Sequence, residues 1–278
     1  MSEMRDMLAL LPTWDLESHK GQSGRVVIVG GSVQYYGAPI FVALGAEAAG
    51  ADLIDVCLPR EHIGTAKRWS LNFFLHPFAD ENLSCNDIEN VCSVAKNADA
   101  VVIGNGVGTA SETQKAVLAI LDNIHDKPVV IDAEALIPAI LDVYKKDRHC
   151  WVLTPHKGEF MKLFNLSPTT QNVNNTANKF HFTICLKGIA DYITSGKEFY
   201  ENHTGIPQMR VGGTGDVLAG IMACYLAQNL PPFVAAKLSA YFFGKCGEAL
   251  AKKAHSFSAY QLLKFYPRFL RGLLKLAK

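Results

Sequence analysis

The stretch Val211-Gly212-Gly213-Thr214-Gly215-Asp216-Val217-Leu218-Ala219-Gly220 joins a glycine cluster to an aspartate and then to an apolar, alanine-rich helical pattern. Glycines let the backbone turn sharply and approach a ligand closely. The free N–H groups of the following helix start add donors and partial positive charge, so the stretch predicts an anion site. Asp216 would repel a bound phosphate unless its carboxylate has a task of its own, and general base catalysis is such a task. The alternative is a tight turn in which Asp216 only caps the helix.

Short apolar runs that end at glycine or polar residues precede this stretch and indicate strands. The first run, residues 25–29, is followed by Gly30-Gly31-Ser32 and a helical pattern over residues 40–49, which together form the start of a βα unit. Further strands are expected over residues 53–57, 98–103, 128–131, 151–154 and 183–187, and helices over residues 112–124 and 134–143. The runs are continuously apolar, as in a parallel sheet covered on both faces. The predicted fold class is α/β, with a single central, mostly parallel sheet, helices on both faces and one domain over residues 1–278.

The last third of the chain reads differently. Residues 192–194 and 197–200 predict a hairpin around Ser195-Gly196, and the chain after the glycine cluster reads as helical to its end. Residues 251–278 carry seven basic side chains and no acidic one. Apolar residues recur there at helical spacing, namely Phe269, Leu270, Leu273 and Leu274. We expect a surface helix that docks its apolar face, with a membrane-surface or oligomer contact as the alternatives.

The composition restricts the class of protein. It is 49% hydrophobic and 19% charged, which allows a sizeable core, and a formal net charge of +1 gives no reason to expect nucleic acid. The seven cysteines are scattered without a C-x-x-C pair, which fits a reducing compartment and suggests neither disulfides nor a zinc site. Because no signal-peptide pattern and no bilayer-length apolar run is present, we expect a cytoplasmic protein without a membrane partner.

Ligands of an open parallel sheet bind outside the carboxyl ends of the strands. Glycine and polar residues follow most of the expected strands, at Gly30-Gly31-Ser32, Gly104-Asn105-Gly106-Val107-Gly108, Asp132, Thr154-Pro155-His156-Lys157-Gly158-Glu159 and Lys187-Gly188. Each has a simpler explanation alone: His156 could cap a helix or lie on the surface, Lys187 could lie in solvent, and Asp132 could brace a loop or hold a metal through water. Their recurrence at successive strand ends favours a common site. A P-loop and a complete dinucleotide-binding fingerprint are both missing from the sequence.

These motifs, in this order, resemble the ribokinase-like superfamily and, within it, the ADP/ATP-dependent NAD(P)H-hydrate dehydratases. Besides those quoted above, the resemblance includes His19-Lys20-Gly21, Tyr36-Gly37-Ala38-Pro39, Ile131-Asp132-Ala133-Glu134-Ala135-Leu136 and residues 202–205. Two departures stand out. Asn105 occupies a position where the family usually has proline, and residues 205–210 are less glycine-rich than usual.

The resemblance implies a metabolite-repair lyase that restores NADH or NADPH from the hydrated forms NADHX and NADPHX. ADP or ATP, with Mg²⁺, would phosphorylate the C6 hydroxyl of the hydrate, and Asp216 would be the catalytic base. By motif match, the substrate-binding residues are Ala38, Gly106, Gly108, His156 and Asp216, and the nucleotide-binding residues are Lys187, Gly188, Asp191, Gly212, Gly213, Thr214 and Gly215. No protein ligand for a metal is expected. Many relatives carry an epimerase domain that does not fit in this chain, so a separate NAD(P)HX epimerase is a possible partner, and a homo-oligomer is expected.

Two other functions stay open at this point. One is a kinase of the same superfamily that phosphorylates a sugar or vitamin alcohol, because Asp216 and its glycines serve both reactions. The motifs at residues 19–21, 37–39 and 154–159 favour the dehydratase. The other is a non-catalytic nucleotide-binding protein, against which the retained Asp216 argues.

Overall fold

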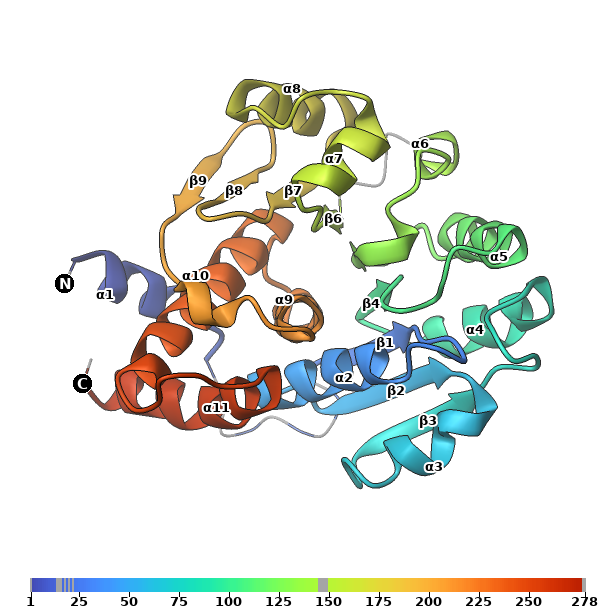
Figure 1. The fold of residues 1–278 in the computed structure, drawn as a ribbon, viewed down its shortest axis with the longest axis horizontal. Coiled ribbons are helices and arrows are strands. Elements are labelled where there is room, and N and C mark those ends of the chain that lie inside the picture. Colours follow the sequence, from blue (N-terminus) through green and yellow to red (C-terminus); the bar gives the residue numbers. More distant parts are fainter. Residues whose placement is uncertain are drawn as a thin grey trace.

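The computed structural model describes residues 2–13, 17, 19, 21, 23–144 and 150–276. Among them, nine strands form one sheet in the order β3-β2-β1-β4-β5-β6-β7-β8-β9 (Figure 1). The strands are β1 (Arg25–Val29), β2 (Leu53–Leu58), β3 (Phe73–Pro77), β4 (Ala100–Ile103), β5 (Val129–Ile131), β6 (Trp151–Leu153), β7 (Thr183–Leu186), β8 (Asp191–Thr194) and β9 (Phe199–Asn202). Strands β1 to β7 pair in parallel, and β8 and β9 add an antiparallel hairpin at one edge. The carboxyl ends of the parallel strands therefore share one rim.

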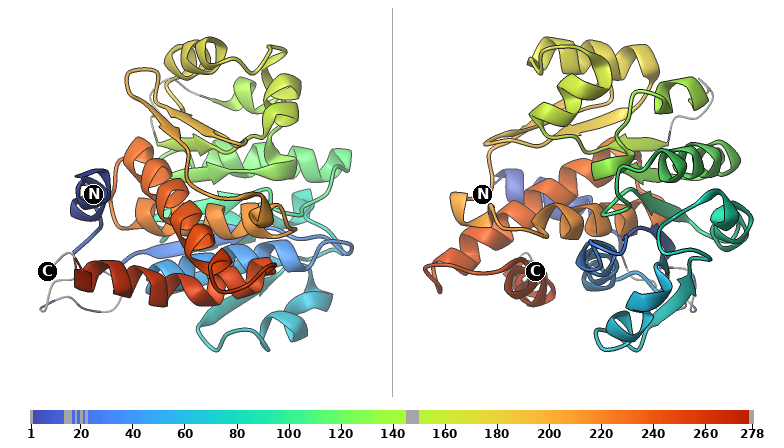
Figure 2. Two further views of the ribbon diagram at one scale, coloured as in Figure 1. Left: turned by 60° about the vertical axis from the view of Figure 1, so that its left-hand side comes forward. Right: turned by 45° about the vertical axis from the view of Figure 1, so that its right-hand side comes forward.

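Helices cover both faces of this sheet (Figures 1 and 2). On one face lie α1 (Ser2–Ala9), α2 (Gly37–Ala49), α9 (Thr214–Ala227), α10 (Pro232–Ala251) and α11 (Ala259–Leu276), whose apolar residues share one core cluster. On the other face, a second core cluster includes apolar residues of α4 (Ile88–Ala95), α5 (Ser111–Asn123), α6 (Ile140–Val143), α7 (Lys157–Phe164) and α8 (Thr170–Phe180). The short α3 (Ile63–Ala66) follows β2.

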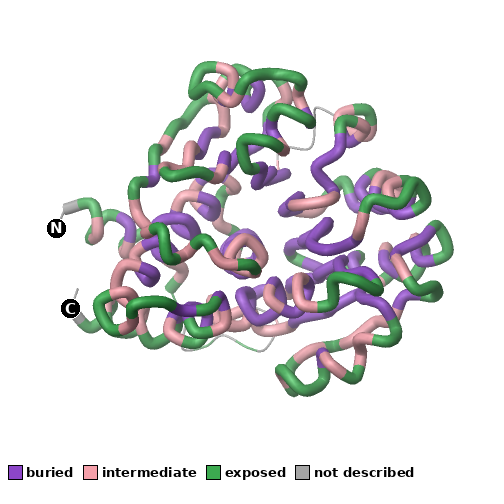
Figure 3. Tube along the Cα trace, viewed as in Figure 1, coloured by how far each residue is buried: buried purple, intermediate pink, exposed green. Residues whose placement is uncertain are grey.

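Strand β1 shows why the strands had to be apolar throughout. Val26 and Ile28 belong to the first cluster, whereas Val27 and Val29 belong to the second, and all four are fully buried. Successive side chains of a strand point to opposite faces, so a strand with helices on both sides buries every position. Figure 3 shows the same arrangement, with buried segments in the centre and exposed ones on the outer helices.

Two glycines set the position of α9, the helix that begins at the glycine cluster. A Cβ atom built on Gly45 of α2 would lie 2.5 Å from the carbonyl oxygen of Val217, and one built on Gly220 of α9 would collide with the carbonyl oxygen of Val42. The two backbones therefore touch, which no larger residue at either position would allow. This contact places the first turn of α9, with Asp216, beside the rim of the sheet.

The fold class expected from the sequence is confirmed, including the hairpin β8–β9 and the helical end of the chain. The docked C-terminal helix is confirmed for Phe269, Leu270 and Leu273, which pack against the first cluster, while Leu274 is exposed. Among the described helices, none reaches the combination of length and hydropathy that a membrane crossing requires. The single domain over residues 1–278 stays a prediction.

The helix expected over residues 134–143 is wrong. That region forms a 3₁₀ turn, Ala133–Ala135, and then the short α6. Pro138 explains the interruption, because proline lacks an N–H donor and disfavours helical backbone in the residue before it. The edge strand β3 was not expected, because the exposed Phe74 and the half-buried His76 and Pro77 leave it without a buried apolar run.

Candidate active site

The glycine cluster forms a tight loop that begins α9. Gly213 is the N-cap residue with φ of 94°, a left-handed conformation that favours glycine. The hydroxyl of Thr214 donates to the carbonyl oxygens of Met209 (3.0 Å) and Val211 (2.9 Å), which ties the loop to the preceding 3₁₀ turn. Asp216 lies inside the first turn, three residues after the N-cap. The alternative in which Asp216 is merely the N-cap is therefore wrong.

The carboxylate of Asp216 belongs to a chain of polar contacts along the rim. Lys187, after β7, donates from Nζ to Oδ1 of Asp132, after β5, at 2.7 Å. Asn105, after β4, donates from Nδ2 to Oδ2 of Asp132 at 3.0 Å and to Oδ1 of Asp216 at 2.7 Å. The structure thus brings together residues from three strand ends and the glycine cluster, as the sequence predicted. Lys187 is not a solvent lysine, because its ammonium group forms an ion pair with Asp132.

The loop after β4 is held on both sides of Asn105. Gly104 and Gly106 have φ of 123° and 76°, and the N–H of Gly31 donates to the carbonyl oxygen of Asn105 at 2.9 Å. The N–H of Gly106 donates to Oε2 of Glu134 at 3.0 Å. The side chain of Asn105 therefore starts from a fixed backbone.

Burial and neighbouring charges tune the ionisable groups of this rim. Burial raises the pKa of Asp216 to about 7, the amide of Asn105 opposes this rise, and Asp132 adds to it. Burial alone would lower the pKa of Lys187, but the contact with Asp132 outweighs it, so the pKa lies above its ordinary value. Asp216 thus has a pKa near neutrality, which suits a general base, while Lys187 stays a cation.

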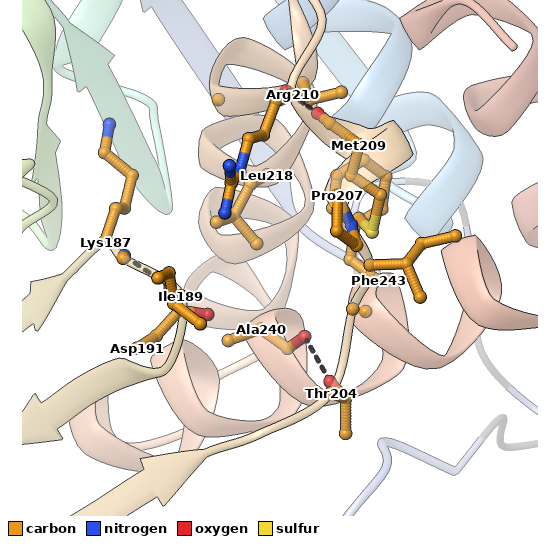
Figure 4. Close-up of a pocket in the computed structure, with 16 residues that line it drawn as sticks. Lys187, Ile189, Asp191, Thr204, Pro207, Met209, Arg210, Leu218, Ala240 and Phe243 are labelled. Atoms are coloured by element: carbon orange, nitrogen blue, oxygen red, sulfur yellow. Dashed lines mark hydrogen bonds between the residues drawn. The ribbon is translucent and has the colours of Figure 1, made fainter. Parts of the chain in front are cut away.

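A pocket of about 240 Å³ opens beside Lys187 and Gly215 (Figure 4). Five of the predicted nucleotide-binding residues line it: Lys187, Gly188, Asp191, Thr214 and Gly215. Gly212 and Gly213 continue the same loop outside the lining. The carboxylate of Asp191 accepts from the N–H of Gly188 and from Nδ2 of Asn202, each at 3.0 Å. These hydrogen bonds connect the turn after β7 to the end of β9 and thereby stabilise this side of the pocket.

Most of the predicted substrate-binding residues lie near Asn105 and outside the pocket lining. A Cβ atom on Gly106 would lie 3.1 Å from Cβ of Ala38, so the loop after β4 contacts the start of α2. One on Gly108 would lie 3.9 Å from Cβ of Ser32. Asp216 joins them through its hydrogen bond with Asn105, which lies in the same loop as Gly106 and Gly108.

His156 is the N-cap of α7. Its Nδ1 accepts from the N–H groups of Gly158 (3.0 Å) and Glu159 (3.2 Å), and 61% of its side chain is exposed. The capping role weighed from the sequence is therefore confirmed. Its backbone pairs with that of Lys187, so it still lies at the rim. Lys20, from the motif at residues 19–21, lies outside the described residues.

Several pocket residues were not expected from the sequence. Arg210 extends along Leu218 into the pocket, and the described residues provide no ion-pair partner for its guanidinium (Figure 4). Phe243 and Gly244 reach the pocket from α10, far along the chain. Arg210 could have been suspected, since it stands in the segment that departs from the usual glycine-rich pattern. No sequence signal identifies the two α10 residues, because their placement depends on how α10 is rotated.

The carboxylates of the described residues do not gather into a cluster of metal ligands. Among the described residues, no group of three or more His, Cys, Asp or Glu side chains could hold a metal ion. Asp132, which forms the ion pair with Lys187, already accepts from both Lys187 and Asn105. Magnesium that enters on a nucleotide takes most of its ligands from phosphates and water.

Comparisons with known proteins identify the family of this chain. Residues 26–268 match the family model described as NAD(P)H-hydrate dehydratase. The ADP-dependent (S)-NAD(P)H-hydrate dehydratase of Nitrosopumilus maritimus is 33% identical over 87% of this chain and 86% of its own length. The bifunctional NAD(P)H-hydrate repair enzyme Nnr of Hyperthermus butylicus is 37% identical over 94% of this chain, which spans about half (51%) of that longer relative.

Solved structures show the same fold. A ribokinase-like superfamily protein of Enterococcus faecalis V583 superposes with a TM-score of 0.85 and 26% identity, over 97% of this chain and 94% of that one. The ribokinase-like fold expected from the motifs is thereby confirmed. The chain, with its polar rim, its glycine loop and its pocket, thus belongs to the NAD(P)H-hydrate dehydratase family.

Proposed function

We propose that this chain dehydrates hydrated NADH and NADPH, with ADP or ATP as the phosphoryl donor and Asp216 as the base. The observation that carries the proposal is the placement of Asp216. Its carboxylate has a pKa near 7 and follows directly after Gly215, which lines the pocket beside Lys187. A base next to a cationic, glycine-lined pocket is suited to phosphoryl transfer, where positioning and charge stabilisation supply most of the rate.

In this proposal the pocket beside Lys187 holds the nucleotide. Lys187 and Arg210 line it with two cationic side chains against one acidic side chain, Asp191. A phosphate chain would therefore find a net positive wall on this side, and the N–H groups at the start of α9 would add donors. The apolar part of the lining, which includes Met209 and Phe243, offers a surface for the nucleobase of the nucleotide. The name of the Nitrosopumilus relative supports ADP as a donor.

The hydrate would lie on the other side of Asp216, near Ala38, Gly106, Gly108 and His156. Asp216 takes the proton of the C6 hydroxyl as that oxygen attacks the terminal phosphorus of the nucleotide. A C6–O–P bond forms, the bond from the phosphorus to the leaving oxygen breaks, and the nucleotide leaves one phosphate shorter. The N–H groups of residues 212–215 stabilise the charge on the transferred group. Magnesium bound to the phosphates would supply further charge neutralisation.

The second half of the reaction follows from the position of the phosphate. The lone pair of the ring nitrogen expels it from C6, and inorganic phosphate leaves with the electrons of the C–O bond. Loss of a proton from C5 then restores the C5–C6 double bond of the dihydronicotinamide. Phosphorylation thus converts hydroxide, a poor leaving group, into phosphate, a good one, and the net reaction is that of a lyase.

The test is to add ADP or ATP with Mg²⁺ to the hydrate and the purified chain and to follow the absorbance of reduced nicotinamide. We expect absorbance to recover with one phosphate released per molecule restored. A phosphorylated product that accumulates without recovery would indicate an ordinary kinase instead. Absence of turnover with either nucleotide would contradict the dehydratase function. The separate epimerase partner and the homo-oligomer stay predictions.

A further inference from the structure

Asn105 bridges two carboxylates from a single nitrogen. Its Nδ2 donates to Oδ1 of Asp216 at 2.7 Å and to Oδ2 of Asp132 at 3.0 Å. An amide NH₂ has two N–H donors, so both are engaged in these bonds. The opposite orientation of the amide would point its oxygen at two carboxylates, which only accept hydrogen bonds when ionised. The contacts therefore fix the amide in one orientation.

The side chain of Asn105 is fixed by its backbone as well as by its carboxylate partners. It is 1% exposed, and its backbone is held by the N–H of Gly31. Asp132, which anchors the second N–H, is itself held by Lys187 at 2.7 Å. The contact on Asp216 thus rests on a fixed backbone and on a fixed partner. A base that is oriented by a third group is the arrangement that nucleophile activation uses in general.

The other polar atom of Asn105, its amide oxygen, takes no part in these contacts. Its Oδ1 is buried and has no hydrogen-bond partner among the described residues. Buried polar atoms are nearly always paired, and an unpaired one lowers folding stability. The amide nitrogen, with its two carboxylate contacts, is the part of the side chain that has a task.

We propose that Asn105 is the positioning residue of Asp216: it holds Oδ1 of the carboxylate and leaves Oδ2 directed to the substrate hydroxyl. Among the described residues, Oδ1 has Asn105 as its partner, and the structure gives Oδ2 none. The two oxygens therefore have different tasks, one for orientation and one for proton transfer. This inference rests on the proposed function, in which Asp216 is the base.

The hydrogen bond from Asn105 also affects the pKa of Asp216. Three charged groups face Asp216 besides the amide: Asp132 and Glu134 raise its pKa, and Lys187 lowers it. A hydrogen bond donated to the ionised form favours that form, so Asn105 also lowers the pKa of Asp216. Removal of the donor therefore raises this pKa, and the base then needs a higher pH to lose its proton.

The test substitutes Asn105→Leu, which removes the donor at similar volume, and Asn105→Ala, a smaller side chain that also lacks the donor and serves if the leucine variant fails to fold. We expect the acid limb of the dehydratase pH profile to move up by about one pH unit. At pH 7 this shift corresponds to a loss of roughly five-fold in activity, which returns as the pH rises toward 9. Asn123→Leu, at an exposed helix position, is the control and is expected to leave the profile unchanged.

A second readout does not depend on turnover. In protein with ¹³C-labelled aspartate carboxyl groups, the signal that Asp216→Asn removes is assigned to Asp216 and titrated by NMR. We expect its midpoint to rise in both Asn105 variants, and an unchanged midpoint in a folded variant would overturn the proposal. If the wild-type chain restores no reduced nicotinamide but the NMR midpoint still rises, the proposed function fails while the contact between Asn105 and Asp216 stands.

Discussion

The substitution Asp216→Asn tests two properties of this carboxylate: its role in turnover and the folding stability that is lost when it ionises. It removes the charge at nearly constant volume, and the new amide oxygen can still accept from Nδ2 of Asn105. We expect turnover to fall by about 10²- to 10⁴-fold, the usual contribution of a general base. Nucleotide binding should change little, because the pocket residues Lys187 and Gly215 are untouched.

The same substitution should stabilise the protein above neutral pH. The pKa of Asp216 is about 7 when folded, against an ordinary value of 3.8. Between these values the folded state holds one more proton than the unfolded state, so the free energy of unfolding falls as the pH rises. The difference is about 3 pH units, which corresponds to at most about 4 kcal/mol at pH 8. The carboxylate is partly exposed, which reduces this figure. The amide of the variant carries no such charge and avoids the loss.

The assay is chemical or thermal unfolding of wild type and variant at pH 5 and pH 8, beside dehydratase kinetics. The gain in unfolding free energy should be up to ~3 kcal/mol larger at pH 8 than at pH 5. At ~2–4 °C per kcal/mol, the melting temperature at pH 8 should rise by several degrees. The exposed Asp126, whose side chain is 67% accessible, provides the control substitution Asp126→Asn, for which we expect no pH-dependent gain.

Two results would refute the reasoning. A variant that keeps near-normal turnover would show that Asp216 is not the base. A variant whose stability relative to wild type is the same at pH 5 and pH 8 would show that Asp216 does not carry a raised pKa. Either result can occur without the other, so the catalytic role and the electrostatic cost are tested separately.

Three further substitutions test other parts of the site and fold. Lys187→Ala should weaken the binding of ADP by about ten-fold or more and the binding of the hydrate much less, because the charged contact between Lys187 and the phosphates is lost. An unchanged affinity for ADP, measured by calorimetry, would contradict this role. Arg210→Gln should raise the dissociation constant of ADP by about five-fold, since a guanidinium contact to phosphate is removed, and equal affinities would exclude Arg210 from the phosphate site. Gly220→Ala should destabilise by about 1–3 kcal/mol or more, because the added Cβ collides with the backbone of Val42; Gly64→Ala, which has open space around it, is the control in thermal unfolding.

The spacing of apolar residues predicted the strands and most helices, because a sheet buried on both faces requires strands that are apolar at every position. Strand β1 alternates between two cores and therefore had to be apolar at every position. The pattern failed where local backbone chemistry decides, as at Pro138, which interrupts the helix expected over residues 134–143. It also missed β3, an edge strand that is only partly buried.

The site was predictable in its parts and not in its contacts. Strand-end positions identified Asp132 and Lys187, because parallel strands end at a common rim, and the glycine cluster identified Asp216. Asn105 stood out only as a departure from a motif, and its contact with Asp216 joins residues 111 positions apart. That contact depends on side-chain direction at the end of β4 and on how closely α9 approaches the sheet. Neither quantity is expressed in residue spacing, so only the structure supplies the link.

The difference between a kinase and a dehydratase on this scaffold lies in the substrate rather than in the base. In the proposed reaction, Asp216, the glycine loop and Lys187 act on a hydroxyl and a phosphoryl group, and a phosphorylated sugar alcohol would keep its phosphate after this step. Beside a ring nitrogen the same phosphate is expelled, because the nitrogen lone pair stabilises the carbon that it leaves. The scaffold therefore needs no further catalytic group to become a lyase; it needs an acceptor site that admits the hydrated nicotinamide. If the proposed function holds, the residues that set the reaction outcome are those around Ala38 and Gly106, while the nucleotide pocket can stay that of a kinase.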